Sequence, residues 1–332
     1  MTLSSRLRRW TRRKGARAVD TVEPANAQEI AVPEFPTETL WHYTNTAGLL
    51  GILNNVDKKA EDDKPRSGTY KPILHASAAQ FLNDRRELTL GLDLIKDGLV
   101  ALGVRGSFDP TPEAKAFLQE VARAIQQVVD QTYPDFIHCS IVSFSTQCDS
   151  LSQWRAYGQG TGGFAIGFEP ELFPRNSTLE RIGGLGLQKV TYVTDTLEGQ
   201  LLDAFHLFIA QAQTDIRSGK PNEYAVRKAV QRLALRAASV KHAGFDEERE
   251  WRYVEPGFGQ QLGVPNDPDF KAGAAGLVPH RRIELPAEAV VGLWVGSGPY
   301  QYENYLAAQS MLYRYGYVAA SHNVHRSDTP FR

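Results

Sequence analysis

The chain has 332 residues, of which 42% are hydrophobic and 23% are charged, an ordinary composition for a soluble globular protein. Its formal net charge of -1 at pH 7 gives no overall reason to expect nucleic acid or an anionic membrane as a partner. Cys139 and Cys148 are its only cysteines, which disfavours a disulfide framework and favours a reducing, cytoplasmic location.

The N-terminal segment is basic and low in apolar residues. Residues 6–17 are rich in Arg and lack the apolar core of a secretory signal. Val22–Pro36 has the Pro-, Glu- and Ala-rich composition of a linker. We therefore predict a disordered tail and linker over residues 1–36, which could touch an acidic surface or nucleic acid. No apolar run in the chain is long enough to cross a bilayer, so we expect no membrane span.

Hydrophobic periodicity predicts alternating helices and strands after this tail. The predicted strands are Leu40–Thr44, Ile73–Ser77, Phe136–Ser145, Gly163–Phe168, Gln188–Val193, the segment around Trp251, Val290–Gly296 and Tyr317–His322. The predicted helices are a short one after an Asn45 or Thr46 cap, then 84–99, 112–132, 151–157, 195–218, 222–241 and 299–315.

These elements do not alternate regularly, which favours α+β over a doubly wound parallel sheet. We predict a single domain over residues 37–332 with a mixed, mainly antiparallel central sheet. Helical insertions are expected at about 84–132 and 195–241.

The segment Glu248-Arg249-Glu250-Trp251-Arg252 places four charged residues around one tryptophan. On a strand, Glu248, Glu250 and Arg252 share one face, because side chains alternate with period two. Two carboxylates and a guanidinium on one face are suited to binding a polyhydroxylated ligand and stabilising a cationic transition state. The alternative interpretation is an exposed edge strand whose charged residues prevent pairing with another chain.

Residues 158–163 match G-x-G-x-x-G, but a helix or turn precedes them and a strand follows, so we reject a dinucleotide-binding Rossmann site. Just before this turn, Ser152, Trp154, Arg155 and Tyr157 could form a pocket wall, or a capped helix with Trp154 in the core.

Two further motifs could carry a ligand or simply hold the fold. His42 could donate to a ligand hydroxyl and Tyr43 could stack, although a lone histidine can equally be a packing residue with one backbone hydrogen bond. Asn83 or Asp84 caps the next helix in capping-box fashion with Glu87. We expect no metal, because His322 and His325 have no carboxylate or thiol partner nearby.

Taken in order, these motifs resemble a bacterial family known as domain of unknown function 2971. The matching segments are His42-Tyr43-Thr44, Leu82-Asn83-Asp84 with Glu87, Ser143-Phe144-Ser145, Leu151 with Trp154 and Tyr157, Gly163–Phe168, Glu248–Arg252, and Ser327–Arg332. The resemblance spans about residues 38–332.

A more distant similarity is to ADP-ribosyltransferases, through the order His-Tyr-Thr, serine strand, Glu-x-Glu. This resemblance implies a split sheet, with NAD as substrate and no metal. It implies that His42 binds the ribose, that Glu250 is the catalytic glutamate and that Glu248 orients the acceptor. Tyr157 or Tyr43 would stack on nicotinamide.

The further candidate ligand-binding residues are Thr44, Asn83, Ser143, Trp154, Arg155 and Arg252. Arg155 or Arg252 could pair with the pyrophosphate, since guanidinium matches phosphate oxygens. The chain departs from the pattern, because arginine-specific members with Glu-x-Glu usually carry arginine on the first strand.

Two functions of different class follow. The first is an NAD-consuming enzyme that transfers ADP-ribose to a protein, a nucleic acid or water. The alternative is a non-catalytic module that binds a nucleotide or similar ligand as a sensor in a bacterial defence or stress system. A hydrolase using Glu248 and Glu250 as acid and base is disfavoured, because their i,i+2 spacing is too short to span a sugar.

Overall fold

The structure is a computed structural model, and it describes residues 35–56, 70–81, 85–104, 112–130, 139–158, 162–174, 186–194, 223–256, 268–273 and 276–330. Residues Pro33–Arg332 form one compact unit, and Met1–Val32 is grouped separately. The predicted tail, Asn83 and the predicted helix at 195–218 lie outside the described residues.

The described strands are β1 (Leu40–Thr44), β2 (Ile73–Ala78), β3 (Cys139–Ser145), β4 (Phe164–Phe168), β5 (Gly186–Lys189), β6 (Thr191–Val193), β7 (Val240–His242), β8 (Glu250–Pro256), β9 (Asp269–Gly273), β10 (Gly276–Glu284), β11 (Val290–Val295) and β12 (Val324–Arg326). The helices are α1 (Thr46–Leu53), α2 (Arg85–Val104), α3 (Pro112–Val129), α4 (Leu151–Tyr157), α7 (Glu223–Ala237), α8 (Gln301–Arg314) and α9 (Val318–Ser321). Short 3-10 turns are η2 (Ala79–Phe81), η3 (Pro170–Leu172), η4 (Ala243–Glu248) and η6 (Ala287–Ala289).

These elements confirm the predicted α+β class and correct several boundaries. The strand predicted at Tyr317–His322 is wrong: Val318–Ser321 is helical and the strand follows at Val324–Arg326. The strand predicted at Gln188–Val193 is two strands that break at Val190 and belong to different sheets. The helix predicted at 222–241 ends at Ala237, and the chain then enters β7.

Local chemistry explains why α1 begins where β1 ends. The side chain of Asn45 accepts a hydrogen bond of 2.8 Å from the backbone N–H of Gly48, so Asn45 caps the helix. Leu49, Ile52 and Leu53 are the buried residues of α1, at the spacing of one helical face.

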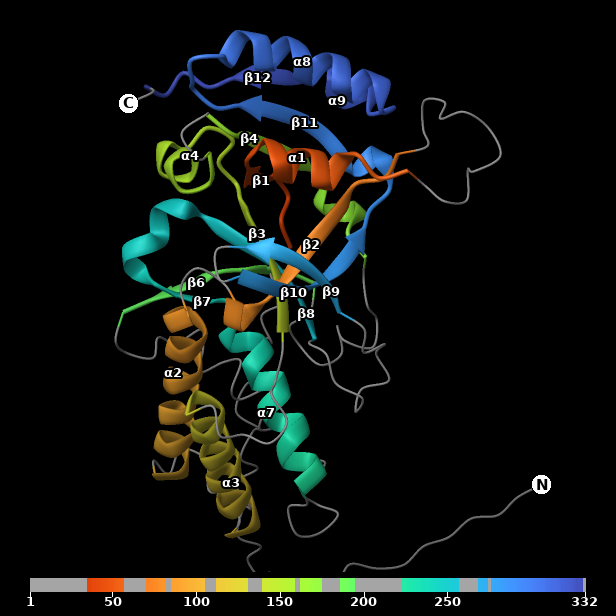
Figure 1. The fold of residues 1–332 in the computed structure, drawn as a ribbon. Coiled ribbons are helices and arrows are strands. Elements are labelled where there is room, and N and C mark those ends of the chain that lie inside the picture. The colour runs from red at the N-terminus through yellow and green to blue at the C-terminus, as the bar shows by residue number, and fades with distance from the viewer. Residues whose placement is uncertain are drawn as a thin grey trace, which may run out of the picture. The chain divides into compact units, whose positions relative to one another are not determined.

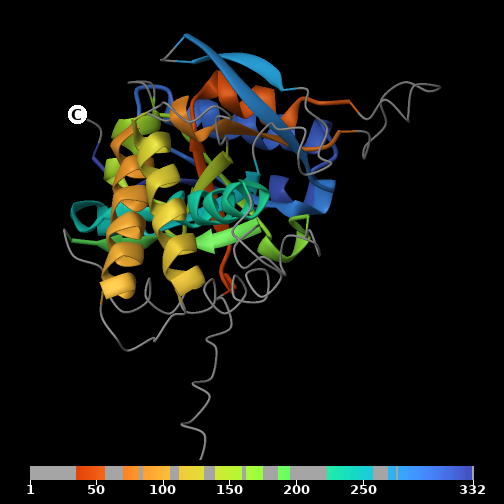
Figure 2. The same cartoon turned by 90° about the horizontal axis from the view of Figure 1, so that it is seen from below.

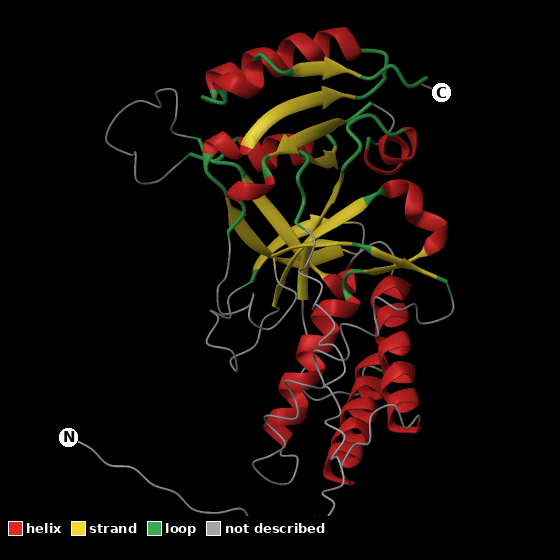
Figure 3. Cartoon of the chain, turned by 180° about the vertical axis from the view of Figure 1, so that it is seen from behind, coloured by secondary structure: helices red, strands yellow, loops and turns green. Residues whose placement is uncertain are grey.

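The main sheet is mixed and mainly antiparallel, and it divides at β3. Its strand order is β12-β11-β4-β1-β3-β2-β10-β9, with β8 also paired to β3 and β5 paired to β8. On β3, Ser145 pairs with Trp41 of β1, whereas Ile141 pairs with Ser77 of β2. β1 therefore pairs with one end of β3 and β2 pairs with the other end. Figures 1 and 3 show the strands diverging from this point.

Two large hydrophobic cores account for most of the buried apolar residues among those described. The larger core lies between the sheet and helices α1, α8 and α9, and contains Phe144, Phe168 and Trp251. A second core joins α2, α3 and α7, with Phe117 and Ile125 fully buried. Figure 2 shows α2 and α3 side by side, with α7 next to them. Within the described residues, no helix is long and apolar enough to cross a membrane.

Candidate functional site

The candidate site is built on the paired strands β3 and β8. Ser145 stands opposite Glu250 and Ser143 stands opposite Arg252, so these four side chains share one face of the sheet. Trp251 points to the other face and is buried in the large core. The predicted arrangement of Glu250, Arg252 and Trp251 is therefore confirmed.

Glu248 does not belong to this strand, contrary to prediction. It is the last residue of η4, and Arg249 after it has the left-handed conformation with φ of 44°. This turn ends the alternation of side chains, because period two holds only within a strand. Glu248 nevertheless lies close to Ser145, the residue that pairs with Glu250, because the Ser145 hydroxyl donates a 2.7 Å hydrogen bond to the Glu248 carbonyl.

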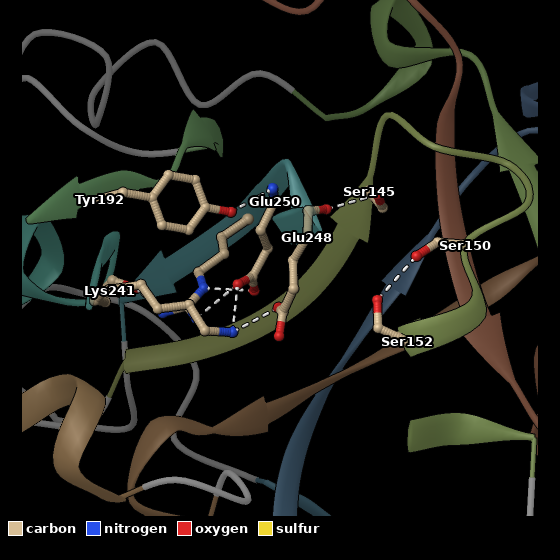
Figure 4. A network of polar contacts seen from close by, with 9 residues as sticks. Ser145, Ser150, Ser152, Tyr192, Lys241, Glu248 and Glu250 are labelled. Carbon is tan, nitrogen blue, oxygen red and sulfur yellow. Dashed lines mark hydrogen bonds and ion pairs between the residues drawn. The ribbon is translucent and has the colours of Figure 1, made fainter. Parts of the chain in front are cut away.

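A cluster of four charges surrounds the start of β8 (Figure 4). Arg252 donates two hydrogen bonds to Glu250, from Nε to Oε1 at 2.7 Å and from Nη2 to Oε2 at 3.0 Å. Lys241 of β7 donates to Oε2 of Glu250 at 3.1 Å and to Oε2 of Glu248 at 2.6 Å. We call Lys241, Glu248, Glu250 and Arg252 the charge cluster.

Burial differs sharply between the two carboxylates of the charge cluster. The Glu250 side chain is 5% exposed, whereas that of Glu248 is 21% exposed. Lys241 and Arg252 are also buried. Charged groups are buried only when paired, and here two cations offset two carboxylates.

The charge cluster keeps Glu250 ionised. Burial alone would raise the pKa of its carboxyl, but the charge and hydrogen bonds of Arg252 hold the pKa below its usual range. Lys241 and a hydrogen bond from the Ser143 side chain lower it further. Glu250 is therefore a fixed anion at neutral pH.

Residues that carry no recognisable motif hold this cluster in place. Arg252 Nη1 donates to the Ala238 carbonyl at 2.6 Å, and the backbone N–H of Glu250 donates to the Tyr192 hydroxyl at 2.8 Å. Sequence reasoning missed Lys241 and Tyr192. A lysine or tyrosine on a short strand gives no signal of its own, and only the parallel pairing of β6 with β7 brings both to the start of β8.

His42 lies on the opposite face of the sheet from Glu250. Trp41 pairs with Ser145, and Ser145 pairs with Glu250, so these three residues form a row on one face. His42, one residue further along β1, points to the other face, where its ring lies 5.8 Å from that of Phe144. The structure therefore does not bring His42 and Glu250 together.

His42 instead forms a hydrogen bond with a backbone carbonyl of β3, where the sheet divides. Its Nδ1 lies 2.9 Å from the Ser143 carbonyl, which can only accept, so Nδ1 carries the proton. Burial lowers the pKa of His42 to about 4, against a raising effect of this hydrogen bond. The imidazole is neutral at pH 7.

Tyr43 and Trp154 pack against each other on the face that carries Glu250. Their rings meet edge to face at 4.7 Å, in a cluster with Ala165. The Tyr43 hydroxyl donates to the Gln147 carbonyl at 2.7 Å, and Trp154 Nε1 donates to Asp149 at 2.7 Å. Both aromatic residues are therefore core residues of this small cluster, as the core alternative for Trp154 predicts.

The remaining predicted ligand residues in the described part of the chain lie on α4 and on β1. Arg155 and Tyr157 are exposed on α4, and the hydroxyl of Ser152 lies 3.0 Å from that of Ser150 (Figure 4). Thr44 shares the face of His42, because it lies two residues further along β1. Figure 4 shows the Ser150–Ser152 pair apart from the charge cluster.

The glycine turn before β4 is explained by close backbone contact. Gly163 has φ of 72°, and a Cβ built there would lie 2.7 Å from Gly158 Cα. At Gly162, with φ of 103°, a Cβ would lie 2.7 Å from the Gly296 carbonyl oxygen. Each position requires a positive φ and leaves no room for a Cβ, and only glycine meets both requirements. Backbone packing alone therefore accounts for Gly162 and Gly163.

No group of three or more His, Cys, Asp or Glu that could hold a metal occurs in the part of the chain that the structure describes.

The comparisons with known proteins give one match. Neither the comparison with curated proteins nor that with solved structures finds a match. Residues 153–253 match the family described as "Protein of unknown function (DUF2971)", and this segment contains both glutamates of the charge cluster. Over this segment the chain is similar to the DUF2971 family, in agreement with the resemblance that the order of its motifs indicates.

Proposed function

We propose that this chain consumes NAD by breaking the bond between nicotinamide and ribose, with Glu250 opposing the charge that develops. The observation that carries the proposal is the ionised Glu250 carboxylate, held at two points by Arg252. A carboxylate fixed before the reaction stabilises an oxocarbenium-like centre without reorganisation at the moment of bond breaking.

The bond changes balance with NAD and one acceptor. The C1′–N bond breaks and its electron pair goes to the pyridinium nitrogen, which leaves as neutral nicotinamide. An oxygen or nitrogen atom of a macromolecule, or water, bonds to C1′ and loses a proton. Glu248 is the candidate base, because its carboxylate is more exposed than that of Glu250 and contacts the same lysine.

The roles implied for β1 change in this proposal. His42 is assigned to the fold, since it faces away from Glu250 and binds the Ser143 carbonyl. Trp41 takes its place as the first-strand residue of interest, because it is only partly buried and shares the row with Ser145 and Glu250. An indole face is suited to stacking on a planar ring.

A second candidate is the non-catalytic nucleotide-binding module. One observation favours it: both carboxylate oxygens of Glu250 already accept hydrogen bonds within the charge cluster, and the side chain is buried. In this role the cluster positions the strand and turn beside a bound nucleotide, and no bond is broken.

The test is release of nicotinamide from NAD by the purified full chain, with and without cell lysate, followed by chromatography. Labelled ADP-ribose on protein and nucleic acid is measured in the same reactions. The key variant is Glu248→Gln, because its partly exposed carboxylate can be removed with less effect on folding. Glu247→Gln, at the exposed neighbouring position, is the matched control.

We expect the wild-type chain and Glu247→Gln to release nicotinamide at equal rates. Glu248→Gln should be slower by about a hundredfold, the lower end of a lost general base. NAD binding by calorimetry without nicotinamide release would establish the module instead. If NAD neither binds nor turns over, the NAD-consuming function is rejected, and the module would have to bind a different nucleotide.

A further inference from the structure

Basic side chains gather on one face of the adjacent strands β2, β10 and β9. Arg282 pairs with His75 and His280 pairs with Ser77, so His75, His280 and Arg282 share a face. His280 also pairs with Asp269, and Lys271 lies two residues along β9 on the same face. We call His75, Lys271, His280 and Arg282 the basic cluster.

The members of the basic cluster are in close contact. The rings of His75 and His280 lie 4.4 Å apart between centroids, at 36°. The Lys271 ammonium donates to the His75 carbonyl at 3.3 Å. Arg282 lies 3.8 Å from Asp269, in a pair that is exposed on both sides. Asp269 is thus the acidic neighbour of four basic side chains.

His280 places a buried imidazole inside this cluster. Its side chain is buried, with 4% exposure, and its Nδ1 makes no hydrogen bond of good geometry to any residue in the described part of the chain. A buried polar nitrogen without a partner costs free energy, and such groups commonly mark a ligand or ion.

The charges within the basic cluster oppose one another. Burial lowers the pKa of His75 to about 4, and His280, Lys271 and Arg282 lower it further. Burial and Lys271 also lower the pKa of His280, and burial lowers that of Lys271. Asp269 acts in the opposite direction on both imidazoles, and a second anion beside them would favour their protonated forms further.

We propose that the basic cluster binds a phosphate group. Arg282 and Lys271 supply the charge, and the imidazoles of His75 and His280 supply donors once they take up protons. Phosphate suits this set, because its oxygens accept several hydrogen bonds from guanidinium and ammonium groups at once. A divalent metal is disfavoured by the ammonium of Lys271 beside both imidazoles.

This site is separate from the charge cluster. Following the pairing from His280 through Ser77 and Ile141 leads to Val254 on β8, four residues beyond Glu250. Phosphate binding at the basic cluster is therefore independent of the proposed NAD chemistry. Glu248→Gln should bind phosphate like the wild-type chain even if it releases no nicotinamide.

The experiment is calorimetric titration of the full chain with inorganic phosphate, AMP and adenosine. Arg282→Gln and Lys271→Gln are the test variants, and the first is the safer for folding because Arg282 is exposed. Arg314→Gln is the control, since α8 packs near β11 and β12, at the other end of the sheet. Imidazole NMR of His75 and His280 is recorded during each titration.

We expect phosphate to bind the wild-type chain and Arg314→Gln equally, and Arg282→Gln about tenfold more weakly, the effect of one lost charge-assisted hydrogen bond. The His75 and His280 resonances should move toward the protonated form. Tighter binding of AMP than of phosphate identifies a nucleotide, and equal binding identifies the phosphate group alone. The proposal is overturned if neither phosphate nor AMP binds. It is also overturned if Arg314→Gln weakens phosphate binding as much as Arg282→Gln does.

Discussion

The side chains of His42 and Glu250 leave the same sheet on opposite faces. The pairing of Trp41 with Ser145 and of Ser145 with Glu250 fixes this relationship. One bound ligand cannot contact both side chains without passing through the sheet. The two residues therefore have different tasks: His42 satisfies the Ser143 carbonyl at the division of the sheet, and Glu250 anchors the charge cluster.

The first prediction concerns pH and the burial of His42. Burial lowers its pKa in the folded chain to about 4, below the value near 6.5 of an unfolded histidine. Between these values the unfolded chain binds more protons, so the free energy of unfolding falls as pH falls from 6.5 to 4. The loss from this one group is at most roughly 3 kcal/mol.

The measurement is urea unfolding at several pH values for the wild-type chain, His42→Gln and the surface control His322→Gln. His42→Gln should be less stable at pH 7, because the Ser143 carbonyl loses its well-fitted donor. It should also show a flatter pH dependence than the other two proteins. Parallel curves for all three would contradict the burial of a neutral imidazole.

The second prediction concerns the stability of the charge cluster. Glu250→Gln leaves Arg252 and Lys241 buried without their shared anion, which should cost about 3–5 kcal/mol. Because the Glu250 side chain is buried, its removal changes folding stability as well as any chemistry at the site. Thermal unfolding followed by circular dichroism measures the effect.

The double variant Glu250→Met with Arg252→Met is the internal control for this reasoning. It removes one buried anion and one buried cation together, and apolar side chains of similar volume can replace such a pair at little cost. We expect the double variant to be more stable than Glu250→Gln. A double variant that is no more stable than Glu250→Gln would contradict the pairing of the two charges.

The third prediction uses two glycines with opposite surroundings. At Gly163, alanine would have an unfavourable positive φ and a Cβ 2.7 Å from Gly158 Cα, so Gly163→Ala should lose several kcal/mol. At Gly51, inside α1, a Cβ meets no atom within 4 Å. Gly51→Ala should therefore gain about 0.5–1 kcal/mol. Chemical unfolding of both variants tests the pair, and equal effects would contradict it.

Much of the fold could be predicted from local patterns. The strand at β1 and the Asn45 cap of α1 follow from alternation and side-chain chemistry within a few residues. The pair β9 and β10 was not predicted. Pro279 and the charged residues of β10 interrupt the alternation of apolar and polar residues that indicates a strand, as is common near a sheet edge. Such a strand is defined by its partner β2 more than by its own sequence.

The candidate site was harder to predict than the fold. Alternation correctly placed Glu250 and Arg252 on one face, because that relation is local. The relation between His42 and Glu250 depends on the register of β1, β3 and β8, which sequence periodicity does not contain. Lys241 joins the charge cluster through the pairing of β7 with β6 and through the turn η4, which brings Glu248, seven residues further along the chain, back to it.

The last prediction concerns Asp149, which joins α4 to the C-terminal segment. Its Oδ1 accepts hydrogen bonds from Trp154 Nε1 at 2.7 Å and from the Ser327 hydroxyl at 2.5 Å, while Oδ2 accepts from the backbone N–H of Asp328 at 3.2 Å. An asparagine keeps one acceptor oxygen and turns the other into a donor. Asp149→Asn should therefore cost about 1–3 kcal/mol, because two donors then face each other.

Hydrogen exchange locates this effect. In Asp149→Asn the amides of Asp328 and Thr329 should exchange faster, whereas amides in β3 should be unchanged, since only the link to the C-terminal segment is weakened. Asp328→Asn is the matched control, because its side chain is exposed and its backbone N–H still meets Asp149. Faster exchange in both variants would mean that charge near the C-terminus, and not the acceptor at Asp149, holds this segment.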